Sequence, residues 1–310
     1  MSVRSEKKKK KKWVKILISI FVVLFLSIGA YVYSVYKSLS DAVETMHNPI
    51  DRDKSDKRTE DVSLNDAQPF SVLLLGVDQR ANDRGRSDTI IVLTVNPTEN
   101  SVKMLSIPRD TRTEIIGRGT MDKINHAYAF GGVEMSMATV ENFLDIPIDY
   151  YVQVNMEGFK DIVDAVGGVT VQNNLDFSYG GTHFATGTIN LTGTEALNYA
   201  RMRKEDPQGD FGRQARQRQI IQGVISEGAS LSSLTNYGDI FTALGNNVKT
   251  SLTFSQMVTI QSKYKAASKS IEQIQLTGSG GNIDGIYYFN VPEDEKTKVQ
   301  QLLKQHLEVE

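Results

Sequence analysis

Basic side chains are concentrated in the segment Arg201–Gln219, which contains five arginines and one lysine. Asp210, Arg213 and Gln217 are spaced i, i+3 and i+7, so they would lie on one face of a helix. That face continues as apolar residues from Ile220 onward, which should point into the core. A charge in line with a buried stripe is unusual, because burying it is costly unless it is paired. The segment therefore predicts either internal Arg–carboxylate pairs or a site for an anionic ligand.

Arginines and aspartates also stand beside predicted strands. Short apolar runs at residues 70–77, 89–95 and 102–107 are typical of strands buried on both faces. Ligands of open α/β sheets bind at the carboxyl ends of strands, so we expect the polar residues beside these runs to share a cleft with Arg201–Gln219. These residues are Asp78, Arg86, Asp88 and Arg109.

This combination of side chains suits a phosphate ligand. Arginine binds phosphate oxygens in a bidentate manner, and Mg²⁺ is usually held by one or two carboxylates plus substrate phosphates. Asp78 and Asp88 are the natural pair for such an ion. Arg201 and Arg203 would face the same way on an extended edge of the cleft, because side chains alternate along an extended chain. The alternative is that all these charges form ordinary surface Arg–Asp pairs, which contribute little energetically.

Other kinds of chemistry find no support in the sequence. The chain has no cysteine, so disulfides and thiolate metal sites are excluded. It contains no Walker A motif, no H-E-x-x-H motif and no G-x-S-x-G motif. His126 is the only histidine near a polar cluster, and we interpret it as a structural residue.

The N-terminus has the pattern of a membrane anchor. Arg4 and seven lysines precede an uncharged stretch of twenty residues, Ile16–Val35, which as a helix would span the hydrocarbon core of a bilayer. The positive-inside rule places the lysine-rich end in the cytoplasm and the rest of the chain outside, as a single-pass protein of the cell membrane. A cleaved signal peptide would have a shorter apolar region and a small-residue cleavage site. A polybasic nuclear or nucleic-acid signal is the other interpretation of the lysines, but a nucleic-acid binder more often has a basic domain, so we expect no nucleic-acid partner.

We therefore divide the chain into four parts: a basic cytoplasmic tail at 1–15, a transmembrane helix at 16–36, a polar extracellular stalk at 37–68 and a folded domain at 69–310. The stalk is expected to be helical near the membrane and loose further out. In the domain, predicted strands alternate with predicted helices, which favours a layered α/β/α fold with a central mixed sheet.

Several predicted elements lie in the second half of the chain. Residues 173–191 are expected to form a hairpin or a long loop, and 283–288 a strand. Helices are predicted near 234–244, at 254–267 and at 293–307. Some apolar residues could line a cavity for a lipid tail, although core packing is the more common role; they are Met135, Met137, Phe143, Phe159, Ile220 and Phe241.

Five motifs together resemble the LytR-CpsA-Psr family, in the same order and with the same spacing. They are GVDQRANDRGRSDT (76–89), SIPRDT (106–111), KINHAYAFGG (123–132), VDAVGGV (163–169) and ALNYARMRKEDPQGDFGRQARQRQ (196–219). The likeness covers the chain from about Phe70 through the closing helix, and the membrane anchor followed by a stalk is similar too.

The resemblance implies an outward-facing phosphotransferase of cell-wall assembly. It would take an anionic glycopolymer such as wall teichoic acid from a polyprenyl-pyrophosphate carrier and join it to peptidoglycan. By likeness, the pyrophosphate would be held by Arg86, Arg109, Arg201, Arg203, Arg213 and Gln217, and Mg²⁺ by Asp78 and Asp88. Arg109 and Asp210 would act in catalysis, Asp210 by orienting the neighbouring arginines. The family also binds the prenyl tail in a hydrophobic tunnel.

Three alternatives use the same residues. A hydrolase of prenyl pyrophosphates would replace the sugar hydroxyl with water, and a capsule polysaccharide ligase would transfer a different polymer. A non-enzymatic, membrane-bound regulator would bind the lipid pyrophosphate without reacting. The general base is left open among Asp78, Asp88 and Asp210, since a carboxylate bound to Mg²⁺ is a poor base.

Overall fold

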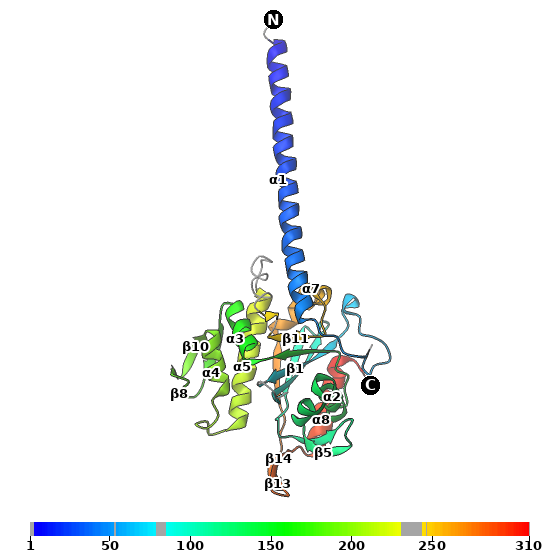
Figure 1. The fold of residues 1–310 in the computed structure, drawn as a ribbon, viewed down its shortest axis with the longest axis vertical. Coiled ribbons are helices and arrows are strands. Elements are labelled where there is room, and N and C mark those ends of the chain that lie inside the picture. Colours follow the sequence, from blue (N-terminus) through cyan, green and yellow to red (C-terminus); the bar gives the residue numbers. More distant parts are fainter. Residues whose placement is uncertain (1–2, 53, 79–84, 231–243, 246, 310) are drawn as a thin grey trace.

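A six-stranded mixed sheet forms the centre of the domain in the computed structural model, which describes residues 3–52, 54–78, 85–230, 244–245 and 247–309 (Figure 1). The strand order is β11-β6-β1-β2-β3-β12. The β1–β6 and β3–β12 pairs are parallel and the other pairs are antiparallel. The prediction of a layered α/β domain with a mixed central sheet is therefore confirmed. The strands are β1 (Phe70–Val77), β2 (Ser87–Asn96), β3 (Ser101–Ser106), β6 (Tyr150–Val154), β11 (Val248–Thr250) and β12 (Ile271–Gln275).

Helices cover both faces of this sheet. Helix α2 (His126–Leu144) and helix α8 (Glu293–Leu307) lie on one face, where Leu73, Leu105 and Leu303 are fully buried. Burial on both faces explains why the strands are continuous apolar runs, since neither side of the pleat meets water. The opposite face carries α5 (Asp210–Ser230), α7 (Phe254–Lys263) and the 3₁₀ turn η3 (Lys265–Lys269).

A third layer lies on the far side of α5. It has its own apolar core around Phe177, Phe184 and Tyr199. Ile220 of α5 packs into this core, whereas Ile221 packs with the core of the central sheet. Helix α5 is therefore buried on two sides, and not along the single stripe that its sequence predicts. The elements of the layer are α3 (Met156–Ala165), β7 (Val169–Asn173), β8 (Phe177–Tyr179), β9 (Thr182–Phe184), β10 (Gly187–Leu191) and α4 (Gly193–Arg201).

Two hairpins lie at the end of the domain away from α1 (Figure 1). The pair β4 (Arg112–Ile115) and β5 (Thr120–Lys123) was not expected from the sequence. The pair β13 (Ser279–Ile283) and β14 (Ile286–Asn290) replaces the single strand expected at 283–288. Phe289 of β14 donates its backbone N–H to the carbonyl of Asp110 at 2.9 Å, which ties this hairpin to the segment after β3.

The N-terminal helix α1 (Val3–Met46) projects from the domain (Figure 1). Its part from Ser19 to Met46 is long and apolar enough to cross a membrane by length and composition. The last turns pack on the domain, where Val43 and Met46 are buried with Leu244 and Val248. One apolar helix therefore fits membrane anchoring.

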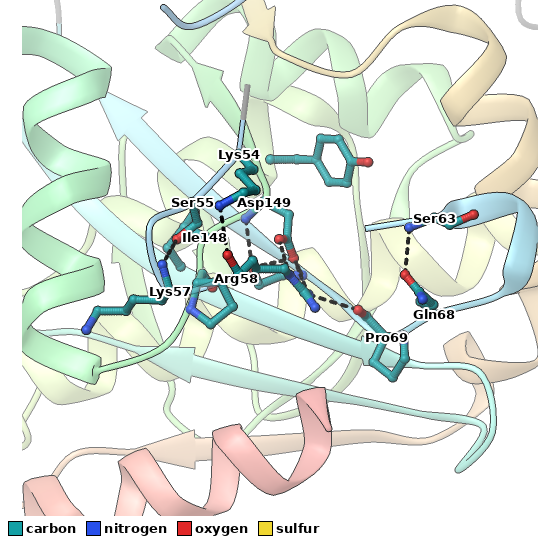
Figure 2. A network of polar contacts seen from close by, with 12 residues as sticks. Lys54, Ser55, Lys57, Arg58, Ser63, Gln68, Pro69, Ile148 and Asp149 are labelled. Atoms are coloured by element: carbon teal, nitrogen blue, oxygen red, sulfur yellow. Dashed lines mark hydrogen bonds and ion pairs between the residues drawn. The ribbon is translucent and has the colours of Figure 1, made fainter. Parts of the chain in front are cut away.

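The segment after α1 is fastened to the domain (Figure 2). Arg58 donates to both carboxylate oxygens of Asp149, at 2.6 and 2.8 Å, and to the carbonyl of Pro69 at 3.0 Å. Arg52 makes a similar bidentate pair with Glu141. The expectation of a loose stalk within 37–68 is therefore wrong for the described residues, because these ion pairs hold the segment against the domain surface.

The helix predicted near 234–244 falls almost entirely outside the described residues, as does Phe241. The apolar residues considered for a lipid cavity do not share one cluster. Met137 and Phe143 belong to the core under α2, while Phe159 and Ile220 belong to the core of the third layer. Met135 is half-buried and packs over Gly131.

Candidate functional site

A β-bulge places two of the predicted carboxylates at one edge of the sheet. Gly76 pairs with Thr89 and Val77 pairs with Ser87, so Asp88 has no partner residue on β1. Asp78 follows β1 directly, and its backbone N–H donates to the carbonyl of Arg86 at 3.4 Å. Bulges re-aim side chains and are frequent beside active sites. The bulge therefore sets Asp78 and Asp88 at the edge where β1 and β3 end.

Arg109 reaches this edge from the end of β3. Its Nη1 donates to Oδ1 of Asp88 at 2.8 Å, and its Nε lies 3.6 Å from Oδ2 of Asp110. Burial lowers the pKa of Arg109, but the hydrogen bond to Asp88 and the charges of Asp88, Asp110 and Asp210 outweigh it and raise the pKa above its usual value. Arg109 is therefore a fixed cation whose position depends on Asp88.

Arg213 approaches the same edge from α5. Its Nη2 lies 2.8 Å from Oδ1 of Asp210 and donates to the backbone carbonyl of Asp88 at 3.4 Å. The side chain is only 11% exposed. Burial lowers the pKa of Arg213, and the nearby cations Arg109 and Arg203 add to the effect while Asp210 and Asp88 oppose it. Two arginines and two aspartates thus form one cluster between the sheet edge and α5.

Buried polar atoms without a hydrogen-bond partner gather around this cluster. Within the described part of the chain, eight such side-chain atoms are found. They lie at the start of β2, at the end of β3, on Arg109 shortly after β3, on α5 or, for Asn125, on a residue whose backbone N–H donates to the carbonyl of Arg109. One of them, Oδ1 of Asp210, forms an ion pair with Arg213 but no hydrogen bond. Buried polar groups in folded proteins are normally hydrogen-bonded, so this concentration indicates a place where a polar ligand completes the bonding. The residues are Ser87, Ser106, Arg109, Asn125, Asp210, Arg213, Gln214 and Arg218.

The remaining predicted site residues are less closely engaged. Arg86, Arg201 and Arg203 are exposed. The expectation that Arg201 and Arg203 share a strand-like edge is wrong, because Arg201 is the last residue of helix α4. Gln217 is half-buried on α5, one turn beyond Arg213. The structure therefore brings Asp88, Arg109, Asp210 and Arg213 into contact and leaves the other predicted residues at its margins.

Arg216 and Arg218 lie off the helix face that carries Arg213 and Gln217, so the sequence predicts that they are solvent-exposed or structural. Both are buried, with 6% and 4% of their surface exposed. Arg216 has a structural role: its Nη1 lies 2.5 Å from Asp206, and it donates to the backbone carbonyls of Tyr199 and Met202. This network joins α5 to the segment that carries Arg201 and Arg203. The structural alternative is therefore the correct one for Arg216, whose side chain is buried because α5 faces protein on two sides.

Two further polar residues lie near the cluster. Asp110, which the sequence analysis did not single out, pairs with Lys123 at 2.7 Å while it flanks Arg109. Nδ1 of His126 lies at hydrogen-bond distance, 2.9 Å, from Oδ2 of Asp122, and its ring makes an edge contact with Phe130. His126 makes these local contacts at the start of α2, which agrees with a structural role.

The match to known proteins places this arrangement in a family. Residues 32–305 match the LytR_cpsA_psr family. The chain therefore belongs to the LytR-CpsA-Psr family, and the resemblance carried by its motifs is confirmed.

Individual relatives are similar over nearly the whole chain. A protein of Bacillus cereus named polyisoprenyl-teichoic acid–peptidoglycan teichoic acid transferase TagU is 56% identical over 301 residues, which cover 97% of this chain and 99% of that protein. The crystal structure of B. subtilis TagU is 54% identical, with a TM-score of 0.64, and covers 78% of this chain and 98% of that one. The family protein YwtF (TagT), solved with bound octaprenyl pyrophosphate lipid, is 33% identical with a TM-score of 0.71 over 85% of this chain and 100% of that chain.

Proposed function

We propose that this protein is a membrane-anchored phosphotransferase that moves teichoic acid from a polyprenyl-pyrophosphate carrier to peptidoglycan. The observation that carries the proposal is the cluster of Arg109, Arg213, Asp88 and Asp210, set among buried polar atoms that lack partners. The name of the B. cereus relative and the octaprenyl pyrophosphate bound to TagT support the same substrate class.

The reaction requires the enzyme mainly to position groups and to stabilise charge. A hydroxyl oxygen of peptidoglycan attacks the phosphorus that bears the polymer, a new P–O ester bond forms, and the P–O bond to the prenyl phosphate breaks. Arg109 and Arg213 hold the phosphate oxygens as negative charge develops on them. Asp88 and Asp210 orient these two guanidinium groups, at 2.8 Å in each case.

Three exposed arginines at the edge of the cluster provide further binding groups for the pyrophosphate of the donor. Arg86, Arg201 and Arg203 are exposed to solvent. Binding a phosphate oxygen therefore costs each of them little free energy of desolvation. Gln217 adds a neutral amide one turn along α5 from Arg213. The proton of the attacking hydroxyl passes to a carboxylate, for which Asp78, Asp88 and Asp210 are the available groups.

We propose further that Mg²⁺ binds at Asp78 and Asp88, as in an EC 2.7.8-type transferase. The described residues hold no group of three His, Cys, Asp or Glu side chains suited to a metal ion. Two carboxylates at the bulge nevertheless fit Mg²⁺, which takes one or two carboxylates and completes its shell with phosphate oxygens and water. Bound there, the ion would neutralise charge on the pyrophosphate.

The orientation in the membrane belongs to the same proposal. We propose that the N-terminus lies in the cytoplasm and the domain outside, where peptidoglycan is found. The lysines before the apolar stretch of α1 support this orientation through the positive-inside rule. Protease added to intact cells should therefore cut a cleavage site inserted within residues 173–191. If that site is protected from the protease, the proposed orientation is wrong and the domain lies in the cytoplasm.

The decisive experiment incubates the full-length protein in detergent with a lipid-linked teichoic acid donor, peptidoglycan oligomers and Mg²⁺. We expect a product in which polymer and peptidoglycan are joined through phosphate, lost with Arg109→Ala and diminished by EDTA. Release of polymer at the same rate with and without peptidoglycan would instead identify a hydrolase. Binding of the donor without turnover would identify a regulator, and a capsule polysaccharide donor that reacts faster would identify a capsule ligase.

A further inference from the structure

Helix α5 contains two buried arginines with opposite surroundings. Arg216 faces the carboxylate of Asp206 at 2.5 Å and two backbone carbonyls. Arg218 donates from Nε to Oε1 of Gln273 at 3.1 Å and from Nη2 to Oε1 of Gln275 at 3.3 Å, and both acceptors are neutral. A buried guanidinium is therefore balanced by a carboxylate in the first case only.

The charge of Arg218 has no counterion among the residues that the structure describes. Its Nη1 is buried and has no hydrogen-bond partner. Burial lowers the pKa of Arg218, and no carboxylate opposes this effect, whereas Asp210 and Asp88 do so for Arg213. An unpaired buried charge costs far more than a paired one, so a chain that keeps this arginine requires an anion to offset it.

The surroundings of Arg218 contain further unpartnered polar atoms. Gln214 lies one helical turn before Arg218, so the two side chains lie on the same side of α5. Its Nε2 donates to Asp210 at 3.0 Å, while its Oε1 is buried without a partner. Across from α5, Gln275 pairs in register with Ser106, whose Oγ is also buried and unpartnered.

These contacts connect Arg218 to the site already described. Asp210 contacts both Arg213 and Gln214, and Ser106 ends the strand that leads to Arg109. The polar lining thus continues from Asp210 and Arg213 one turn inward along α5, between this helix and the β3–β12 edge of the sheet. The continuation combines a cation with a hydroxyl and an amide.

We propose that Arg218 is an anion-binding residue, and that it forms with Ser106 an internal subsite for a phosphate group. A phosphate offers the guanidinium a bidentate acceptor and can accept from the hydroxyl of Ser106. This inference rests on the proposed function in one respect: the phosphate nearest the prenyl chain, which departs with the lipid, is the group that would reach furthest inward. Arg218 would then stabilise the leaving group while Arg109 and Arg213 hold the phosphate that is attacked.

The test compares Arg218→Met with Arg216→Met in the full-length protein in detergent. The two variants remove buried arginines two residues apart on one helix. If Arg218 serves a ligand, Arg218→Met without ligand should unfold at the temperature of the wild type or above, because an unbalanced charge has been removed. Arg216→Met should unfold at a clearly lower temperature, because Asp206 is left buried without its partner.

Binding provides the second measurement, with octaprenyl pyrophosphate, octaprenyl monophosphate and inorganic pyrophosphate as the three probes. We expect Arg218→Met to weaken octaprenyl pyrophosphate binding about ten- to hundredfold, the usual loss for hydrogen bonds to a charged group. Arg218→Lys, which keeps the charge without the planar fork, should lose less. An equal loss for the monophosphate lipid would assign the subsite to the leaving phosphate. A loss confined to inorganic pyrophosphate would show that the lipid phosphate does not reach Arg218, which overturns the inference.

The outcomes separate the inference from the proposed function. Wild-type protein that binds none of the probes contradicts the proposed function. Wild-type protein that binds octaprenyl pyrophosphate, together with an Arg218→Met variant that binds it equally well, overturns the inference alone. Unfolding of Arg218→Met at a temperature as low as that of Arg216→Met, or its failure to fold, overturns it too, because the guanidinium would then be a structural group.

Discussion

The arginines of the candidate site are held by aspartates before any ligand arrives. Arg109 is fixed by Asp88 at 2.8 Å and Arg213 by Asp210 at the same distance. A phosphate that enters between them does not have to order flexible cations, which lowers the entropic cost of binding. The same pairs keep two like charges close to each other, so that both cations act on one anion.

The geometry of Arg109 should matter more than its charge. Lysine in this position keeps the positive charge but cannot present two parallel N–H groups to a phosphate while it pairs with Asp88. We expect Arg109→Lys to lower the transfer rate about 10²- to 10³-fold, the usual effect of removing a donor that stabilises a transition state. The rate of polymer transfer at saturating donor measures this.

Arg112→Lys is the matched control for that variant. Arg112 lies three residues further along and is half-buried, with its guanidinium carbon 5.8 Å from the centre of the Tyr288 ring. Its replacement should leave the rate within a factor of about two, since lysine keeps a cation over that ring. Equal losses in the two variants would show that the effect at residue 109 is not specific to the site.

At the scale of single elements, close packing between α3 and α4 decides the position of Arg201, which lies at the edge of the candidate site. Gly193 begins α4, and a Cβ built there would lie 2.3 Å from the carbonyl of Lys160 on α3. Gly193→Ala should therefore push α4, whose last residue is Arg201, away from α3. We expect a loss of about 1–3 kcal/mol in the free energy of unfolding, as for other overpacked positions.

A glycine elsewhere provides the comparison. Gly228 lies in α5, where an added Cβ would meet nothing within 4 Å. Gly228→Ala should raise the stability by about 0.5–1 kcal/mol, since alanine loses less backbone entropy in a helix. Urea unfolding of both variants checks the pair, and a Gly193→Ala protein as stable as the wild type would show that α3 and α4 can separate without cost.

Helix α8 is attached to the sheet through a buried histidine. Nδ1 of His306 lies 2.7 Å from Thr94 Oγ1, and Nε2 lies 2.9 Å from Ser101 Oγ. Burial lowers the pKa of His306; the charge of Lys103 also lowers it, and that of Glu99 raises it. In the unfolded chain the pKa returns to about 6.5.

The pH dependence of stability follows from that difference. As the pH falls below about 6.5, the unfolded chain takes up the proton before the folded chain does, so stability is complete above this pH and declines below it. We expect the urea midpoint to fall between about pH 7.5 and pH 5.5, and to fall less in His306→Gln. The same decline in both proteins would assign the effect to other groups.

The elements that the sequence predicts best are those with an uninterrupted pattern. The apolar run Phe70–Val77 and the closing helix Glu293–Leu307 have the expected bounds. Burial of a strand on two faces leaves a continuous apolar run, and burial of a helix along one stripe leaves a helical period. The β4–β5 hairpin was missed because Arg112–Lys123 is largely polar, and its strands bury only Thr113 and Ile115, too few to show a strand pattern. The two-sided burial of α5 was missed for a related reason: its buried Arg216 and Arg218 resemble surface residues.

The site was predictable in its residue types and less so in its geometry. The convergence of Asp88, Arg109 and Arg213 follows from strand order, since β1 and β3 end where β2 begins. The bulge at Asp88 depends on the pairing register, which no local pattern contains. The helical state of Arg201 and the burial of Arg218 depend on contacts between distant segments, so the sequence alone could not assign them.

At the scale of the whole molecule, the membrane helix and the domain form a continuous structure. α1 has 44 residues and is about 66 Å long at 1.5 Å per residue, enough to cross a bilayer and still reach the domain. Its last turns and the following segment pack on the sheet, where Asn48 donates to the hydroxyl of Tyr151 at 2.7 Å. These contacts therefore fix the position of the domain relative to the apolar stretch of α1.

This continuity predicts where the chain can be cut. A fragment that begins at Pro69 lacks Arg58 and Arg52, and leaves Asp149 and Glu141, with side chains 5% and 8% exposed, without their cations. Each broken buried pair costs about 3–5 kcal/mol, and together they approach the whole stability of a typical domain. We therefore expect the fragment 69–310 to be unfolded or aggregated, and the fragment 48–310 to unfold cooperatively on heating. Arg58→Met in the fragment 48–310 should lower its melting temperature part of the way toward that of the fragment 69–310. Equal melting temperatures for the two fragments would show that residues 48–68 do not stabilise the domain.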